Sequence, residues 1–120
     1  DIFDSYLLIG DETALPAIAR RLEGLAANRR ALVVVEIENG AEQQVLDSPA
    51  EVEVIWVLRE GGKDHLLTTV QQLVLPEGQL YAWIATEAKA SRQIRRVLLD
   101  DKGLDQQFVK AVGYWQLDPH

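Results

Sequence analysis

Short apolar runs separated by amphipathic segments constrain this chain more than any other feature of its sequence. Four runs stand out, each about a strand long, at residues 6–9, 31–35, 54–58 and 81–85. Continuous apolar runs rich in β-branched residues are typical of parallel strands that are buried on both faces. Because helices must then cover both faces of the sheet, the pattern predicts an α/β fold with three layers.

The full pattern predicts five strands and three helices in one domain that spans residues 1–120. Strands are expected at residues 6–9, 31–38, 52–58, 80–86 and 108–115. Helices are expected at residues 14–27, 66–75 and 87–100, with Thr13 as the N-cap of the first helix and Pro16 in its first turn. We therefore expect a five-stranded, mostly parallel sheet with Trp56 and Trp83 in its core.

Charge and residue content exclude several classes of function. The 120 residues include 12 Lys+Arg and 19 Asp+Glu, which gives a net charge of −7 and argues against binding to nucleic acid or to an anionic membrane. No apolar run approaches the roughly 20 residues of a membrane span. The chain has no cysteine and two histidines, so no metal site and no catalytic nucleophile is assigned. Because it begins at Asp1 without Met, we expect an excised domain or a processed piece of a longer protein.

The first candidate site is the segment from Gly10 to Pro16, which follows the first predicted strand. In open parallel sheets, ligands bind outside the carboxyl ends of the strands. A glycine there, followed by a helix start, exposes backbone N–H groups that can hold a phosphate. Asp11 and Glu12 would repel such an anion, however, and the spacing is not that of an established phosphate loop. The alternative is an ordinary strand-to-helix turn, which the pattern alone favours.

Arg59 directly follows the third predicted strand, so it reaches the same edge of the sheet. Its guanidinium could contact a ribose phosphate, or it could simply pair with Glu60. Glu36 and Glu38 alternate onto one face at the end of the second strand, but the sequence shows no cleft for a carboxylate pair.

The predicted third helix carries the only strongly basic patch of this acidic chain. Glu87 is expected at the helix start, where the helix dipole favours a carboxylate. Lys89, Arg92 and Arg96 follow at helical spacing, with Arg95 beside them. They predict either an anion site or, as charge runs on helices usually are, a solvated face.

Three segments taken together resemble the siderophore-interacting protein family of ferric-siderophore reductases. They are residues 6–19, residues 81–88 with Arg92 and Arg96 following, and the Gly-Tyr-Trp run at 113–115. The resemblance covers essentially the whole chain in order and spacing.

The resemblance implies the architecture of ferredoxin–NADP reductases, in which an N-terminal β-barrel binds FAD and a C-terminal α/β domain receives the pyridine nucleotide. This chain is similar to the C-terminal domain, and the FAD-binding barrel is expected in the parent protein. The implied reaction passes electrons from NADH or NADPH, or from ferredoxin in some members, through FAD to a ferric siderophore. Reduction would release Fe(II) in the cytoplasm. The isolated domain is expected to be inactive.

The resemblance also implies roles for the residues at the predicted carboxyl edge. Gly10, Asp11, Glu12, Thr13, Ala14 and Pro16 would form the nucleotide loop. Arg59 matches a position where NADP-using relatives contact the 2′-phosphate, but Leu58 replaces the usual serine before it. The choice between NADH and NADPH is therefore open at this point.

The remaining candidates are expected around the redox centre. Thr86, Glu87 and Ala88 match the segment beside the nicotinamide, and Tyr114 and Trp115 match a region that faces the flavin. Lys89, Arg92 and Arg96 are candidates for attracting an anionic siderophore by their charge alone.

Two other functions remain open on the sequence. The chain could be a docking module for ferredoxin or the siderophore without nucleotide binding, which the acids at positions 11 and 12 favour. It could also be an unrelated α/β interaction domain, which the lack of an upstream FAD-binding barrel would favour.

Overall fold

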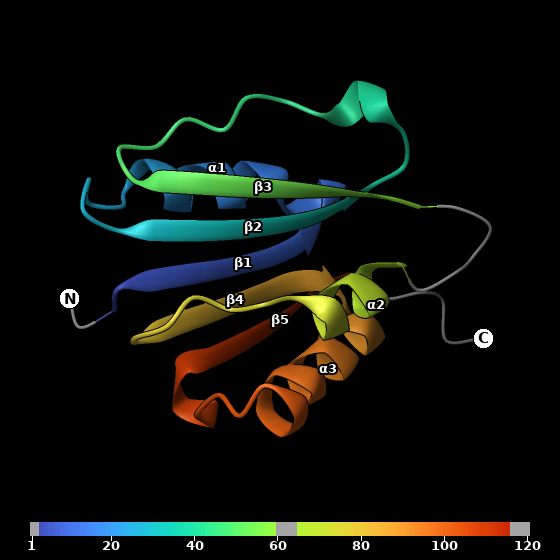
Figure 1. The fold of residues 1–120 in the computed structure, drawn as a ribbon. Coiled ribbons are helices and arrows are strands. Elements are labelled where there is room, and N and C mark those ends of the chain that lie inside the picture. The colour runs from blue at the N-terminus through green and yellow to red at the C-terminus, as the bar shows by residue number, and fades with distance from the viewer. Residues whose placement is uncertain (1–2, 60–64, 116–120) are drawn as a thin grey trace.

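One sheet of five strands forms the centre of the computed structural model, which describes residues 3–59 and 65–115 (Figure 1). The strands are β1 (Ser5–Asp11), β2 (Arg30–Ile37), β3 (Glu51–Leu58), β4 (Leu80–Glu87) and β5 (Val109–Trp115). They lie in the order β3-β2-β1-β4-β5, and all four pairings are parallel. The predicted parallel sheet is confirmed.

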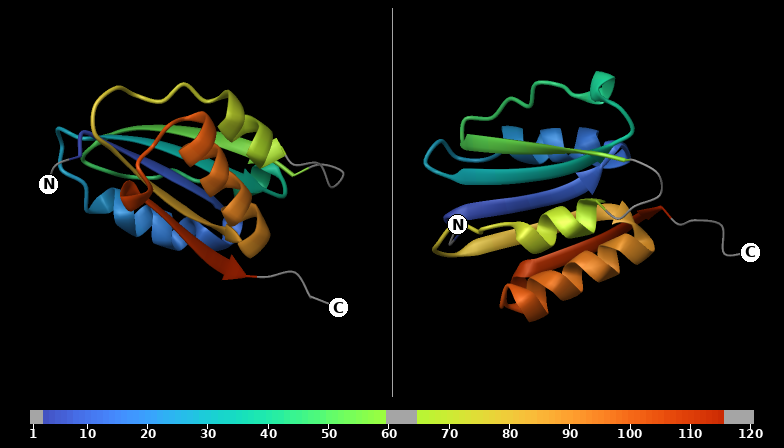
Figure 2. Two further views of the ribbon diagram at one scale, coloured as in Figure 1. Left: turned by 90° about the horizontal axis from the view of Figure 1, so that it is seen from below. Right: turned by 45° about the vertical axis from the view of Figure 1, so that its right-hand side comes forward.

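Helices cover both faces of the sheet, which confirms the predicted three layers. They are α1 (Leu15–Glu23), α2 (His65–Gln72) and α3 (Ala88–Arg96). Figure 2 shows α1 on one face and both α2 and α3 on the other. Because β1, β2 and β4 are buried from two sides, their alternate side chains enter two different cores.

The two cores explain why the central strands β1, β2 and β4 are mostly apolar. On the side of α2 and α3, Leu7 and Ile84 pack with Ile94 in one buried cluster. On the side of α1, Leu8 and Trp83 pack with other apolar side chains in the second cluster. Trp83 is buried as predicted.

Trp56 departs from the prediction because it is only partly buried against the second cluster. It lies on β3, which is at the edge of the sheet, so it has neighbouring strands on one side only.

The helices end earlier than their apolar spacing predicts. The first stops at Glu23 instead of residue 27, with Gly24 as its C-cap, although Leu25 still packs against the core. The second stops at Gln72 instead of residue 75, and Val74 beyond it is 91 % exposed. The apolar spacing of the sequence therefore extends beyond the ends of the helices, because residues in the following connections also pack against the core.

The third helix also differs from its predicted range of 87–100. Regular α-helix ends at Arg96, and Val97–Asp101 continues as a π-helical turn. Gly103 follows with φ of +72°, a left-handed conformation that suits glycine and ends the helical segment.

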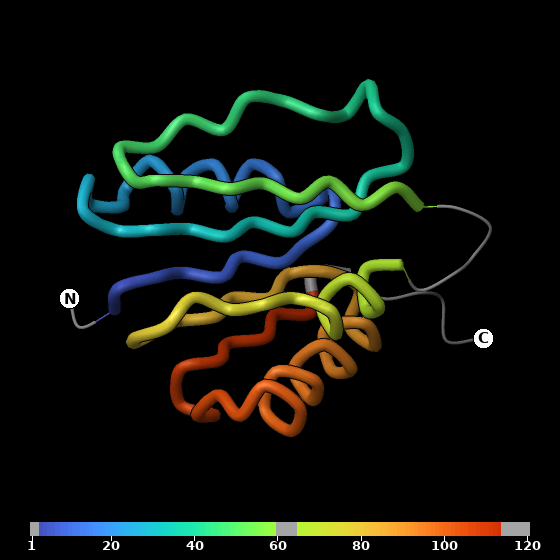
Figure 3. Tube along the Cα trace, in the orientation of Figure 1, coloured from blue at the N-terminus to red at the C-terminus, as the bar shows by residue number. Residues whose placement is uncertain are grey.

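The connection over residues 38–50 runs from the carboxyl edge of the sheet back to its amino edge (Figure 3). Its Ser48 hydroxyl donates a hydrogen bond to the Leu22 carbonyl at the end of α1. This contact ties the connection to the layer that covers β1 and β2. Among the described residues, no helix has the length and apolar content needed to cross a membrane.

Candidate functional site

The strand order reverses between β1 and β4, and this is where open α/β sheets bind ligands. β2 and β3 extend from one side of β1, whereas β5 lies beyond β4 on the other side. Gly10 pairs with Ala85 in the register of β1 and β4, so the residues that follow both strands meet at one edge. This carboxyl edge brings together the two predicted segments at residues 10–16 and 86–88.

Asp11 lies at the centre of this edge with its carboxylate turned inward. The residue is 1 % exposed. Its Oδ1 accepts from the Thr13 backbone N–H at 2.9 Å and from the Thr13 hydroxyl. Its Oδ2 accepts from the Thr86 hydroxyl at 2.8 Å, across from β1 to β4. Asp11 therefore links the ends of β1 and β4 by a hydrogen bond.

One prediction about this turn needs correction. Thr13 is not the N-cap, because Asp11 caps the short helix η1 (Glu12–Ala14) that precedes α1 and Thr13 is a donor to it. The repulsion expected between Asp11 and a bound anion stays a prediction. A buried carboxylate that already accepts these hydrogen bonds is not directed at a ligand.

Gly10 is explained by packing within the fold. A Cβ atom built on Gly10 would lie 2.8 Å from the Ala85 carbonyl oxygen and 3.0 Å from the Ala14 Cβ. Such distances leave no room for any side chain. The glycine therefore permits η1 to lie close to β4, which agrees with the strand-to-helix turn that the pattern favoured for this position.

Arg59 forms a triad with Glu12 and Glu36 across the ends of three strands. Its Nη2 lies 2.8 Å and 3.0 Å from the two carboxylate oxygens of Glu12. The Glu36 Oε1 lies 3.2 Å from Nε and 3.1 Å from Nη2. Glu12 follows β1, Glu36 lies near the end of β2, and Arg59 follows β3, so the sheet order brings them together.

The two carboxylates of the triad stabilise the charged form of Arg59. Partial burial by itself lowers the pKa of Arg59, but the hydrogen bonds and charges of Glu12 and Glu36 outweigh it, so the pKa is raised overall. The alternative partner Glu60 lies outside the described residues. Glu12 is therefore paired, and the two acids that favoured a docking module both have partners inside the fold.

Glu87 caps α3, as predicted. Its carboxylate accepts from the backbone N–H groups of Lys89 at 2.7 Å and Ala90 at 3.3 Å. Ala88 is buried against β5, where a Cβ on Gly113 would lie 3.1 Å from the Ala88 Cβ. The glycine of the Gly-Tyr-Trp run thus allows α3 to approach β5 closely.

The basic side chains of α3 are divided between two places. Lys89 and Arg92 are exposed in its first two turns, next to the carboxyl edge. Arg96 is exposed one turn further on, in a shallow groove between α2 and α3 that Asp100 and Asp101 also line. The three bases share a helix face, but the local charge around Arg96 is mixed.

Some of the predicted site falls outside what the structure describes. The backbones of Tyr114 and Trp115 end β5, and Trp115 is in register with Glu87, but their side chains lie outside the described part. Within residues 3–59 and 65–115, no group of three or more His, Asp or Glu side chains could hold a metal ion.

Sequence reasoning missed the two residues that organise the edge around the candidates. Glu36 was seen as half of a carboxylate pair with Glu38, and only the sheet order shows that it faces Arg59. The buried Ser91 was not singled out, although its hydroxyl contacts the Thr86 carbonyl at 3.3 Å and the Val112 carbonyl at 3.1 Å. A serine on the apolar face of a helix was the available signal.

Comparison with known proteins now adds to this geometry. The family model described as siderophore-interacting protein matches residues 3–118. The crystal structure of a siderophore utilization protein from T. fusca is 38 % identical, with a TM-score of 0.83, and the match covers 96 % of this chain and 48 % of that one.

Two curated relatives carry names that state a reaction. The ferric vibriobactin reductase ViuB of Vibrio cholerae is 24 % identical over 94 % of this chain, and the NADPH-dependent ferric-chelate reductase of Escherichia coli is 26 % identical over 91 %. This chain spans 43 % of the length of each. The similarity therefore concerns less than half of both reductases.

Proposed function

Because this chain belongs to the siderophore-interacting protein family, we propose that it is the nucleotide-binding half of a flavin-dependent ferric-siderophore reductase. Electrons would pass from NADH or NADPH through FAD to the ferric siderophore, which then releases Fe(II) in the cytoplasm. FAD would be held mainly by an N-terminal domain of the parent protein. The names of the two reductase relatives support the reaction.

The observation that carries the proposal is the arrangement at the strand reversal. The helical segment formed by η1 and α1 begins beside the ends of β1 and β4 with Asp11 as its cap, so the positive end of its dipole lies at this edge. Thr13 and Pro16 are exposed there, while the Asp11 carboxylate is buried. An edge of this kind fits the pyrophosphate of a dinucleotide.

The other predicted site residues lie on both sides of the expected pyrophosphate position. The nicotinamide would lie beside Thr86, Glu87 and Ala88, where α3 starts. The adenosine would lie toward Arg59, over the ends of β2 and β3. Tyr114 and Trp115 would shield the flavin until the nicotinamide replaces them. The task of this domain is thus to position the nicotinamide, since the cofactors carry the redox chemistry.

The test is anaerobic mixing of the longer, flavin-loaded protein with NADH or NADPH, followed by a ferric siderophore. We expect loss of the flavin absorbance with one nucleotide and its return, with Fe(II) formation, on adding the siderophore. Replacement of Arg59 by alanine is expected to weaken nucleotide binding, so that the nucleotide concentration needed for half-maximal flavin reduction rises about tenfold. Arg30→Ala, which removes an exposed arginine at the amino edge, is the matched control.

A docking module predicts the opposite outcome. In that case neither nucleotide would bleach the flavin, whereas reduced ferredoxin would do so. That result would refute the proposal for this domain.

The basic face of α3 leads to a separate prediction about the siderophore. If Lys89, Arg92 and Arg96 attract an anionic ferric siderophore, replacing all three by alanine should slow its association at low salt by about tenfold. The difference should disappear at high salt, because the charges are then screened. Stopped-flow mixing with a ferric catecholate measures both.

The matched control removes the same charge elsewhere. Arg20, Arg30 and Lys110 are exposed bases outside this face, and their triple alanine variant should associate nearly as fast as the wild type. Equal slowing by both triple variants would show that total charge matters and that the α3 face has no special role.

A further inference from the structure

The triad of Arg59, Glu12 and Glu36 narrows the choice of nucleotide. We infer that this edge accepts a dinucleotide whose adenosine ribose carries a free 2′-hydroxyl, so that NADH rather than NADPH is the electron donor. The inference rests on the proposed function, because it concerns the adenosine end of the same site.

The first argument is that the Nε and Nη2 donors of the Arg59 guanidinium already bind carboxylates. An arginine binds phosphate best through two parallel N–H groups, of which Nε and one Nη form the usual pair. In this structure, Nε and Nη2 contact Glu36, and Nη2 also contacts both oxygens of Glu12. To bind through this pair, a 2′-phosphate would have to displace a carboxylate and leave it without its cation.

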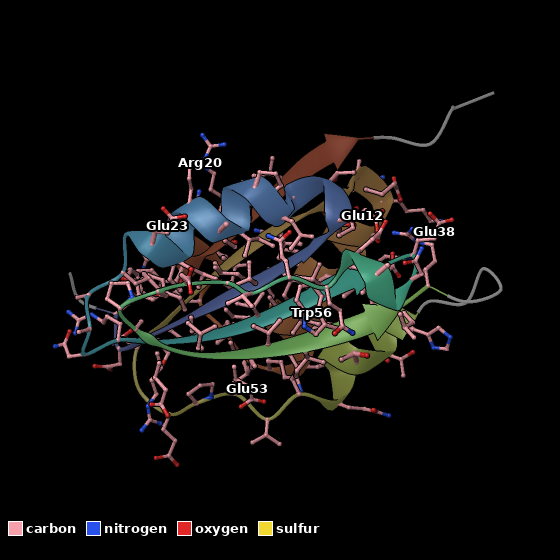
Figure 4. All side chains as sticks on the ribbon, turned by 90° about the horizontal axis from the view of Figure 1, so that it is seen from above. Glu12, Arg20, Glu23, Glu38, Glu53 and Trp56 are labelled. Atoms are coloured by element: carbon pink, nitrogen blue, oxygen red, sulfur yellow. The ribbon has the colours of Figure 1, made fainter. Side chains whose placement is uncertain are left out.

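The second argument is the charge around the guanidinium. Glu12 and Glu36 both contact the guanidinium. Glu38 and Glu42 follow in the turn after β2, where the Glu42 carboxylate accepts from the Glu38 backbone N–H at 2.8 Å. Figure 4 shows Glu12 and Glu38 at the same end of the molecule. The triad has one positive and two negative charges, so the two carboxylates repel a phosphate dianion placed here, whereas a hydroxyl has no such penalty.

The third argument is that Glu36 is placed to accept a hydrogen bond from a hydroxyl. In dinucleotide-binding sheets, an acidic residue at the end of the second strand accepts a hydrogen bond from the ribose 2′-hydroxyl. Glu36 is the second-to-last residue of β2, and its side chain is 17 % exposed. Arg59 engages Oε1, while Oε2 has no hydrogen bond to any described residue. The remaining oxygen is thus available to a ribose.

The experiment compares NAD+ and NADP+, which differ only in the 2′-phosphate. The isotope-labelled chain is titrated with each, and the dissociation constants are read from amide shifts in NMR spectra. We expect NAD+ to bind at least about tenfold more tightly. Equal binding, or tighter binding of NADP+, would overturn the inference and leave the proposed function standing. Binding of neither would overturn the proposed function, and the inference with it.

Charge-removing variants test whether the triad is the cause. Glu12→Gln with Glu36→Gln should reduce the preference for NAD+ at least fivefold, since Arg59 then becomes available to the phosphate. Glu51→Gln with Glu53→Gln removes two exposed carboxylates from the other end of β3 and should leave the preference unchanged. A preference that both double variants alter equally would contradict a role of the triad.

Discussion

Replacing Gly10 by alanine is expected to lower the free energy of unfolding by about 2–4 kcal/mol. The added Cβ would lie 2.8 Å from the Ala85 carbonyl oxygen, 3.0 Å from the Ala14 Cβ and 3.2 Å from the Ile18 Cδ1. The carbonyl belongs to the backbone of β4, which pairs with β1, so it can move only if the strands separate. Chemical denaturation followed by circular dichroism measures the loss.

Gly40 provides the matched control for this substitution. It lies in the short helix η2 (Gly40–Glu42), and a Cβ built there meets nothing within 4 Å. Gly40→Ala should therefore change the free energy of unfolding by less than about 1 kcal/mol. It can even stabilise the fold, because alanine lowers the conformational entropy of the unfolded chain. If both variants lost the same stability, the close approach of η1 to β4 would not be what requires Gly10.

Replacing Asp11 by alanine is expected to cost about 2–4 kcal/mol. The substitution leaves the buried Thr86 hydroxyl and the partly buried Thr13 backbone N–H without their acceptor. It also removes the link between the ends of β1 and β4, so amide hydrogens at this edge should exchange faster. Asp11→Asn keeps one acceptor oxygen and should lose about half as much.

Asp105 is the matched control that shows how much of the loss at Asp11 depends on burial. It caps the helix η4 (Gln106–Phe108) in the same way, accepting from the Gln107 N–H at 3.0 Å, but it is exposed. Asp105→Ala should cost no more than about 1 kcal/mol, the usual value of an exposed cap. Equal losses at positions 11 and 105 would mean that Asp11 acts only as a cap.

The fold was predictable because burial on two faces leaves a strong sequence pattern. Runs such as residues 31–35 are apolar throughout only when both sides of a strand are covered, so the sheet and its layers followed. Helix ends were less predictable, since Leu25 and Leu73 continue the apolar spacing beyond the helices and still pack against the core.

The candidate site was predictable as an edge and not as a set of contacts. Strand ends located Gly10, Arg59 and Thr86, because each follows an apolar run. The partners of these residues depend on strand order, which brings Glu36 to Arg59 from 23 residues away and Asp11 to Thr86 from 75 residues away. No local spacing contains that information.

The central claim is that a pyridine nucleotide binds at the carboxyl edge between β1 and β4. Mapping the amide shifts that NAD+ produces in the isotope-labelled chain tests it most directly. The account predicts saturable shifts that are largest at residues 10–14 and 86–90. No saturable shift, or shifts centred on the amino edge around Ser5, Arg30 and Leu80, would contradict it.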